Sequence, residues 1–459
     1  MTNEYSNLEK IRLEKIQRLR SQGIEPYPTR SERTHTSLEA IRAFEAAEAA
    51  GQVDTVKATL TGRIRSIRPM GKITFAHIED GFGRIQLFFR ANEIGEQQVE
   101  FFNRDFDLGD FIQASGVMFR TRTGEVTLRV QSFKMLSKAV TPLPAAKDEV
   151  VDGQVIRHAT LTEPELRYRQ RYADLAVNPE VRQIFQARTM AVRARREFLD
   201  SRGFLEVETP ILQPIYGGAA ARPFITHHNQ LKQDLYLRIS FELYLKRLLV
   251  GGFERVYEIG RDFRNEGVDR THNPEFTPLE FYMAYADYEQ VMALTEEMVG
   301  FVFERVLGKR KFTYQGQEID LTPPWRRMRL CDGLAEVTGI DIDQHPTAES
   351  LSAAMQARGM QVDPKMPRGK LIENLLSEYI EPVLIPHTFV YDYPRDLSPL
   401  AKSKLGDPST VERFEGFVAG FDWCNAFTEL NDPLDQEARF LEMGRDYAAD
   451  DEERHPMDE

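Results

Sequence analysis

The amino-acid sequence predicts an α+β protein built from two or three domains. The chain has 459 residues, which is too long for one ordinary domain. Residues 53–145 contain short runs in which apolar and polar residues alternate, as they do in half-buried strands. The flanking segments carry apolar residues at helical spacing, together with strand-like runs toward the C-terminus. We therefore expect a β-rich domain near the N-terminus and a larger mixed domain after it.

The composition indicates a soluble globular enzyme. Apolar residues make up 41% of the chain and charged residues 29%, and there is no membrane run. The start, MTNEYSNLEKIRLEKIQRLR, is charged and lacks the apolar region of a signal peptide. Cys331 and Cys424 are the only cysteines, so we expect no disulfide framework. These features predict a cytoplasmic protein.

The charge distribution bears on nucleic-acid partners. A formal net charge of −13 argues against nonspecific binding to nucleic acid. Two segments are nevertheless basic, Lys10 to Arg20 and Arg167 to Arg202. Each is either a patch that contacts RNA or a solvated helix face, so a specific RNA partner stays open.

The N-terminal half divides into three segments. Residues 1–52 predict two helices separated by the proline-containing GIEPYPTR. Residues 53–145 predict about five strands with turns at EDGFG, LGD and RTGE, for which an oligonucleotide-binding (OB) barrel is the leading candidate and a generic β-barrel the alternative. Residues 146–178 are rich in proline, glycine and polar residues and predict a linker.

Residues 179–459 predict the mixed domain. A helix is expected from about Glu180 to Ser201, with Gly203 at its left-handed C-terminal cap. Strands and helices alternate after it, and residues 315–382 predict a helical insertion.

Polar and aromatic residues concentrate between Phe253 and Tyr285, in a predicted strand, loop and strand. A guanidinium can clamp phosphate with two donors, and an aromatic ring can stack on a purine base. A nucleotide polyphosphate is the natural ligand, and a charged hairpin with a surface ion pair is the alternative. The residues concerned are Arg264, Glu266, His272, Asn273 and Phe276.

Three stretches of the sequence resemble one known family. FRNEGVDRTHNPEFTPLEFYMAYADY resembles the second signature motif of class II aminoacyl-tRNA synthetases, in the form found in bacterial lysyl-tRNA synthetases. RGFLEVETPIL resembles motif 1, which in that family helps to build a homodimer interface. IRPMGKITFAHIEDGFGRIQ resembles the anticodon-binding barrel. The resemblance implies a catalytic domain with an antiparallel sheet flanked by helices.

The resemblance also implies roles for individual residues. Arg68, Phe75 and Gln86 would contact the anticodon. Arg264 would clamp the α-phosphate of ATP. The other residues of this nucleotide clamp would hold the adenosine and the outer phosphates of ATP; they are Glu266, His272, Asn273 and Phe276. Glu415 and Asp422 would bind Mg²⁺. The residues that match the family's lysine site are Gly218, Glu242, Glu280, Tyr282, Asn425, Phe427 and Glu429.

These roles imply a lysine–tRNA ligase that activates L-lysine with ATP and transfers it to the 3′ end of tRNA(Lys). The carboxylates suit the ammonium group of lysine, which must be paired when buried. Members of the family continue into a third motif, whose arginine grips the γ-phosphate, whereas the resemblance ends here at Glu459. We therefore expect little lysine-dependent ATP–pyrophosphate exchange from this chain. The alternatives are an inactive tRNA-binding or regulatory protein and an aspartyl or asparaginyl ligase.

Overall fold

The computed structural model describes residues 5–52, 54–144, 147–151, 154–158, 161–269, 271–363 and 366–446, and the side chains of all but 147–158 and 442–446. The chain forms two compact units, Met1–Gln183 and Ile184–Glu459. The acidic segment 451–459, where the resemblance ends, lies outside the described residues. In the described ranges, no helix is long and apolar enough to cross a lipid bilayer.

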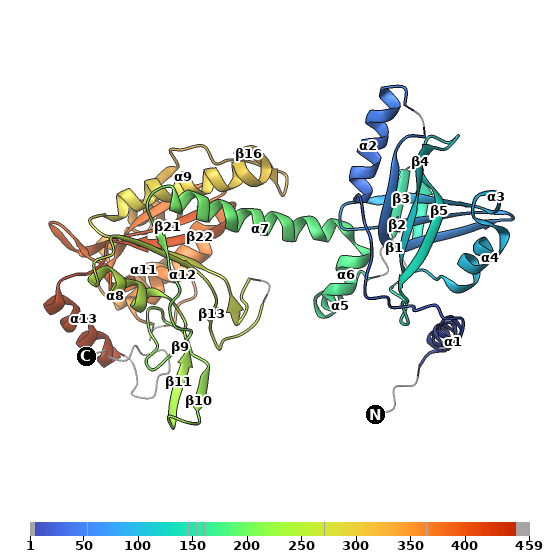
Figure 1. Ribbon diagram of the computed structural model, residues 1–459. Helices are drawn as coiled ribbons and strands as arrows, with labels where there is room; N and C mark the ends of the chain where they lie inside the picture. The colour runs from blue at the N-terminus through green and yellow to red at the C-terminus, as the bar shows by residue number, and fades with distance from the viewer. Residues whose placement is uncertain are drawn as a thin grey trace. The chain divides into compact units, whose positions relative to one another are not determined.

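The first unit is built around a closed barrel with strand order β1-β2-β3-β5-β4 (Figure 1). Alternation along the strands places one set of side chains inside the barrel, as the sequence predicted. Helices lie before β1 and between β3 and β4. The elements are α1 (Asn7–Ser21), α2 (Ser37–Ala49), β1 (Lys57–Met70), β2 (Ile73–Glu79), β3 (Arg84–Arg90), α3 (Ala91–Ile94), α4 (Glu96–Asp105), β4 (Phe111–Arg120) and β5 (Val126–Ser137).

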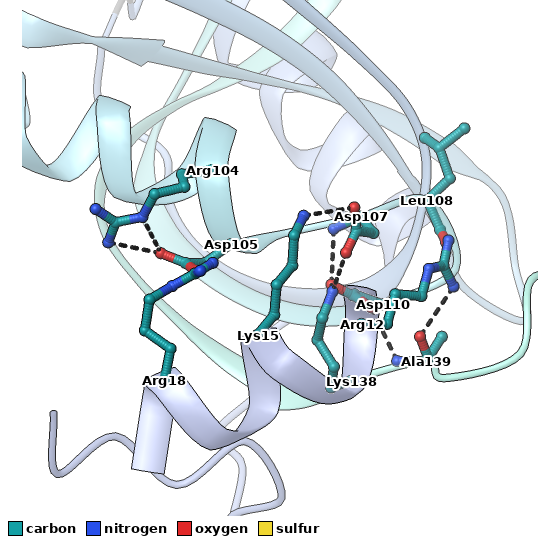
Figure 2. A network of polar contacts seen from close by, with 10 residues as sticks. All are labelled: Arg12, Lys15, Arg18, Arg104, Asp105, Asp107, Leu108, Asp110, Lys138 and Ala139. Carbon is teal, nitrogen blue, oxygen red and sulfur yellow. Dashed lines mark hydrogen bonds and ion pairs between the residues drawn. The ribbon is translucent and has the colours of Figure 1, made fainter. Parts of the chain in front are cut away.

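Helix α1 is attached to the barrel by a network of charged side chains (Figure 2). Lys15 Nζ contacts Asp107 Oδ1 at 2.8 Å, and Arg12 donates to the carbonyl oxygens of Leu108 and Ala139. Lys138 Nζ contacts Asp110 Oδ2 at 2.7 Å, and both of these side chains are fully buried. Ion pairs and hydrogen bonds, more than apolar packing, therefore attach this helix, because much of its predicted apolar stripe remains exposed.

The predicted linker contains regular structure. A hairpin is formed by β6 (Lys147–Val151) and β7 (Gln154–His158), followed by helices α5 (Pro164–Arg169) and α6 (Arg171–Val177). The buried Asp174 carboxylate pairs with the guanidinium groups of Arg167 and Arg171. These helices are short and are stabilised by ion pairs between neighbouring residues, which leaves no apolar periodicity for sequence analysis to detect.

Helix α7 (Pro179–Asp200) and Gly203, at φ +77°, match the predicted helix and its cap. The strands that follow form three small sheets, of which β15-β12-β8 is central to the site. Helices α7 and α9 pack on one face of this sheet, and α8 packs on the other. The elements are β8 (Leu205–Glu206), β9 (Leu212–Gln213), β10 (Ile225–His228), β11 (Gln233–Leu237), α8 (Glu242–Val250), β12 (Arg255–Ile259), β13 (Asp262–Phe263), β14 (Glu275–Phe276), β15 (Leu279–Met283) and α9 (Tyr288–Leu307).

The last sheet has the order β18-β19-β21-β20, with β22 paired to β21. Its two faces carry different side chains: Phe389 and Phe414 pack toward α9, whereas Val390 and Phe417 pack toward α10, α11 and α12. The elements are β18 (Arg326–Arg329), α10 (Leu330–Thr338), η1 (Ile342–Gln344), α11 (Ala348–Ala357), α12 (Arg368–Leu375), η2 (Leu376–Ile380), η3 (Glu381–Val383), β19 (Thr388–Pro394), η4 (Arg395–Leu397), β20 (Ser403–Lys404), β21 (Asp407–Val418), β22 (Phe421–Phe427) and α13 (Pro433–Asp446).

The predicted helical insertion over 315–382 begins later than expected. Strands β16 (Lys311–Tyr314) and β17 (Gln317–Asp320) form a hairpin, β18 follows, and helices start only at Leu330. The turn between β16 and β17 has positive φ at Gln315 and Gly316, which is typical of a two-residue hairpin. The Gln-Gly pair between two short alternating runs was the sequence signal for it.

Candidate functional site

A cavity of about 1180 Å³ lies in the second unit between β15 and β22. Residues 279–283 and 423–427 line it from either side. Among the described residues β15 pairs only with β12, and β22 only with β21, so both strands present an edge to this space. The cavity gathers Arg264 and every residue of the predicted lysine site.

The predicted nucleotide clamp is a two-stranded hairpin, in which Asp262 pairs with Phe276 and Phe263 with Glu275. The Arg264 guanidinium carbon lies 5.2 Å from the centre of the Phe276 ring. The buried Nε of Arg264 has no hydrogen-bond partner in the part of the chain that the structure describes. Because an unpaired buried donor costs free energy, this group is suited to bind an anion that enters the cavity.

The remaining clamp residues lie on the loop that joins β13 to β14. Glu266, His272 and Asn273 are exposed and do not line the cavity. Asp269 accepts hydrogen bonds from the backbone N–H groups of Thr271 and His272, and its Oδ2 lies 2.8 Å from His272 Nδ1. These contacts lower the pKa of Asp269. The structure therefore brings Arg264 and Phe276 together and leaves the other three residues on the loop.

Three carboxylates form the acidic part of the cavity. Glu280 on β15 accepts hydrogen bonds from Ser240 Oγ at 2.8 Å, from the Phe241 N–H at 3.2 Å and from the Tyr282 hydroxyl at 3.2 Å. Burial and the neighbouring charge of Glu242 raise the pKa of Glu280. Burial likewise raises the pKa of the Tyr282 hydroxyl well above its usual value. This hydroxyl therefore stays protonated and can act as a donor.

Glu242 and Glu429 are joined by a lysine side chain of the protein. Lys246 Nζ lies 2.6 Å from Glu242 Oε1 and 2.7 Å from Glu429 Oε2. Burial raises the pKa of Glu429 to about 7, although Lys246 lowers it, because Glu242 and Glu280 also lie close. Carboxylates with such raised pKa values are typical of sites that bind cations or transfer protons.

Gly218 allows the acidic part of the cavity to be narrow. Its φ is +88°, and a Cβ atom there would lie 2.8 Å from Glu242 Cβ and 3.0 Å from Ser240 Oγ. Only glycine fits this backbone conformation and this close approach. On the opposite side, Asn425 accepts a hydrogen bond from Arg413 Nε at 3.0 Å, and the Phe427 ring lies 5.8 Å from Lys246 Nζ.

The two residues predicted to bind metal lie on adjacent strands, Glu415 on β21 and Asp422 on β22. Glu415 contacts Arg413 and accepts a hydrogen bond from the Tyr393 hydroxyl at 2.8 Å. Loss of hydration and the charges of Glu415 and Glu381 raise the pKa of Asp422 to about 6. No group of three or more His, Cys, Asp or Glu residues suited to a metal occurs within the described ranges.

The residues predicted to contact the anticodon share one outer face of the barrel. Arg68 pairs with Phe75 across β1 and β2, with its guanidinium carbon 5.5 Å from the ring centre. Gln86 donates a hydrogen bond to Glu125 Oε2 at 2.7 Å and accepts one from Thr127 at 2.9 Å. An aromatic ring, a cation and an amide thus lie on neighbouring strands, an arrangement that suits single-stranded bases.

Comparison with known families identifies both units. A family model described as tRNA synthetases class II (D, K and N) matches residues 163–459. The chain belongs to this family. A second model, described as an OB-fold nucleic acid binding domain, matches residues 58–136 and confirms the predicted type of barrel. These class II synthetase and OB-fold matches confirm the predicted fold class.

Curated relatives of this class II synthetase match it over nearly its full length. The lysine–tRNA ligase of Roseiflexus castenholzii is 52% identical over 455 residues, which cover 99% of this chain and 90% of that protein. The lysine–tRNA ligase of Pelotomaculum thermopropionicum is 50% identical, covering 99% and 87%. That of Thermoanaerobacter pseudethanolicus is 50% identical, covering 100% and 88%.

Sequence analysis of this synthetase missed several residues at both sites. Ser240, Lys246 and Arg413 line or contact the acidic cavity, and Glu125 contacts the amide of Gln86 on the barrel. Lys246 had a local signal, because it follows Glu242 by one helical turn. The other residues had none, since the site residues that they contact, Glu280, Asn425 and Gln86, lie on other strands.

Proposed function

We propose that the chain is a lysine–tRNA ligase, which forms lysyl adenylate from L-lysine and ATP and transfers the lysyl group to the 3′ end of tRNA(Lys). The observation that carries the proposal is the convergence of Glu242, Glu280 and Glu429 in one cavity with Arg264. Membership of the class II family and the names of the relatives agree with it.

The charges in the cavity suit lysine. Its two ammonium groups need carboxylate partners when water is removed, and Glu242, Glu280 and Glu429 supply them. Its carboxylate needs a cation, and Arg264 offers an unpaired Nε at the wall of the same cavity. Aspartate would place a carboxylate against these three acidic side chains, which repel an anion. Asparagine would place a neutral amide there, which brings no charge to balance them.

The chemistry of activation needs positioning rather than a nucleophile from the protein. An oxygen of the lysine carboxylate bonds to the α-phosphorus of ATP, the bond to the bridging oxygen breaks, and pyrophosphate leaves. Arg264 would hold the α-phosphate, and its contact with Phe276 orients the guanidinium. Phe276 would stack on adenine, and Glu266, His272 and Asn273 would hold ATP if the exposed loop closes over it. The tRNA hydroxyl then attacks the carbonyl carbon and AMP leaves.

Glu415 and Asp422 would hold Mg²⁺. Their charges oppose each other across adjacent strands, as the raised pKa of Asp422 shows, and a divalent cation would relieve this repulsion. Mg²⁺ typically takes one or two carboxylates together with substrate phosphates, and two carboxylates are what these strands offer. When bound, the ion would neutralise charge on the phosphates.

The barrel would bind the anticodon through Arg68, Phe75 and Gln86, with Phe75 stacking on a base. We also infer a homodimer, because the residues that resemble motif 1, 202–212, follow helix α7 and include strand β8. We infer a cytoplasmic location, because two cysteines without a disulfide framework suit a reducing compartment. A molar mass measured by light scattering at twice that of one chain supports the dimer, and the mass of a single chain contradicts it.

Direct binding of amino acids tests the proposed substrate. Calorimetric titration of the chain with lysine, aspartate and asparagine should show binding of lysine alone. Glu242→Gln and Glu429→Gln should each weaken lysine binding in this titration, with little change in the binding of ATP. Glu254→Gln, at an exposed position before β12, is the control. Binding of aspartate or asparagine, or equal effects on both substrates, would contradict the proposal.

A further inference from the structure

We propose that Lys246 holds Glu242 and Glu429 as charged partners for the substrate in the amino-acid site, and thereby favours a substrate that carries two ammonium groups. The inference rests on the proposed function and adds to it a residue that acts on specificity through the carboxylates it contacts. Glu242, Glu280 and Glu429 lie together in the acidic part of the cavity, and Lys246 contacts two of them. When all three are ionised, Lys246 offsets one charge, and the two that remain match the α- and ε-ammonium groups of lysine.

Lys246 occupies a position from which it can act on two of the carboxylates at once. It lies one turn after Glu242 on α8, whereas Glu429 follows β22, so its ammonium joins two separate elements. The 2.6 and 2.7 Å separations are those of charge-assisted hydrogen bonds. Its side chain is 31% exposed, and its stem lies near the Phe427 ring.

The charge of Lys246 favours the ionised form of Glu429. Burial and the charges of Glu242 and Glu280 raise the pKa of Glu429 to about 7, and Lys246 is the cation that opposes this rise. The pKa of Lys246 itself is raised: burial lowers it, but the charges of Glu242 and Glu429 outweigh that effect. Lys246 therefore stays charged over the whole physiological range, and without it the pKa of Glu429 would rise further, so Glu429 would hold a proton over more of the neutral range.

In the part of the chain that the structure describes, no ion pair joins Arg188, Arg195, Lys402 or Arg413 of the cavity wall to Glu242, Glu280 or Glu429. The Tyr282 hydroxyl donates to Glu280, and Arg413 contacts Glu415 and Asn425. Lys402 Nζ lies 2.9 Å from Asn431 Oδ1. In the proposed function, Arg264 binds an anion, either the carboxylate of lysine or the α-phosphate of ATP. Among the described side chains, Lys246 is thus the cation that directly contacts the acidic group.

A second reading makes the opposite prediction. Lys246 could be only a resident occupant, whose ammonium fills the place of the substrate's ammonium and must leave when lysine binds. Removing it would then strengthen lysine binding, because a competitor would be gone. If Lys246 instead keeps Glu429 ionised, its removal weakens lysine binding, because Glu429 takes up a proton and the substrate loses a charged acceptor. The sign of the change therefore separates the two readings.

The test is calorimetric titration of lysine into the wild-type chain, Lys246→Met and Lys246→Arg, from about pH 6 to about pH 9. We expect Lys246→Met to bind lysine about tenfold more weakly near pH 7 and to recover toward wild-type affinity at the upper end, where Glu429 ionises without help. Lys246→Arg keeps the charge and should retain binding at every pH. Lys370→Met, which removes an exposed lysine paired with Glu373, is the control.

Three results would overturn the inference. Tighter lysine binding by Lys246→Met would make Lys246 a resident occupant, unchanged binding would remove its role, and an equal loss at every pH would make the role structural. If Lys246→Met does not fold, Lys246→Gln keeps a donor between the two carboxylates and should show the same pH-dependent loss. A wild-type chain that binds no lysine would contradict the proposed function itself, which distinguishes that failure from the other three.

Discussion

Gly218 lies so close to Glu242 that a Cβ atom on the glycine would come within 2.8 Å of Glu242 Cβ. Gly218 also has a φ of +88°, a backbone conformation that residues other than glycine rarely adopt. Backbone conformation and lack of space therefore act together at the wall of the acidic cavity. Because Gly218 has no side chain, Glu242 can lie at the wall of the cavity, where a bound ammonium group can contact it.

Gly218→Ala should weaken lysine binding at least tenfold, because Glu242 must move away from the new methyl group. The clash and the strained φ should also cost about 1–3 kcal/mol of stability. Gly252→Ala is a matched control, since Gly252 also has positive φ but no atom within 4 Å of the added Cβ. Calorimetry and urea denaturation measure the two effects. Equal lysine affinities in the two variants would contradict this account.

Arg264→Lys should weaken the binding of ATP although the positive charge is retained. Lysine cannot reproduce the fork of donors or the contact with Phe276, so we expect a loss of about 1.5–3 kcal/mol in binding free energy, or roughly ten- to a hundredfold in affinity. Arg261→Lys, at an exposed position that pairs with Glu275, is the control. Near-normal ATP binding by Arg264→Lys in a calorimetric titration would exclude a role for the guanidinium fork.

Phe75→Ala should weaken tRNA binding by about 1–3 kcal/mol, because one stacking surface for a base is lost. Activation of lysine should be unchanged, since the barrel and the acidic cavity lie in different units. Phe82→Ala removes an exposed aromatic ring from the β2–β3 loop of the same barrel and serves as the control. The dissociation constant for tRNA(Lys), measured by titration with the tRNA, distinguishes the two. Similar constants in both variants would refute stacking on Phe75.

Asp262 should make stability depend on pH. Burial and the charge of Glu280 raise its folded-state pKa to about 7, from an ordinary value of 3.8. The stability that the protonated form contributes is complete below the unfolded pKa, and it is lost as pH rises from about 4 through about 7. Asp262→Asn should therefore remove part of the loss in unfolding free energy over this interval. An unchanged pH profile in thermal unfolding would contradict the assignment.

Lys138→Met should destabilise the barrel by about 3–5 kcal/mol, because it leaves the buried Asp110 carboxylate without its cation. Adding Asp110→Asn should restore part of the loss, since the uncompensated charge is removed as well. Lys134→Met changes an exposed lysine on β5, four residues before Lys138, and is the control. Denaturant unfolding gives the free energies, and losses that simply add in the double variant would argue against the pair.

The prediction of structure from sequence succeeded where the signal was local. Alternation along β1 to β5 predicted the barrel, and Gly203 marked the end of the helix that became α7. The hairpin of β16 and β17 was missed because its strands have only four residues each, so the Gln-Gly turn between them was a weak signal. The short helices α5 and α6 were missed for a related reason, since ion pairs rather than an apolar stripe stabilise them.

The sequence alone determined which chemical groups are present and how neighbouring residues are spaced. Its motifs indicated Arg264 with Phe276, and through the family resemblance they indicated the acidic residues. Only the tertiary structure decided that Glu242, Glu280 and Glu429 face one cavity, and that Lys246 joins two of them. The physical reason is that charges interact through space over a few ångströms, while these side chains come from α8, β15 and the segment after β22.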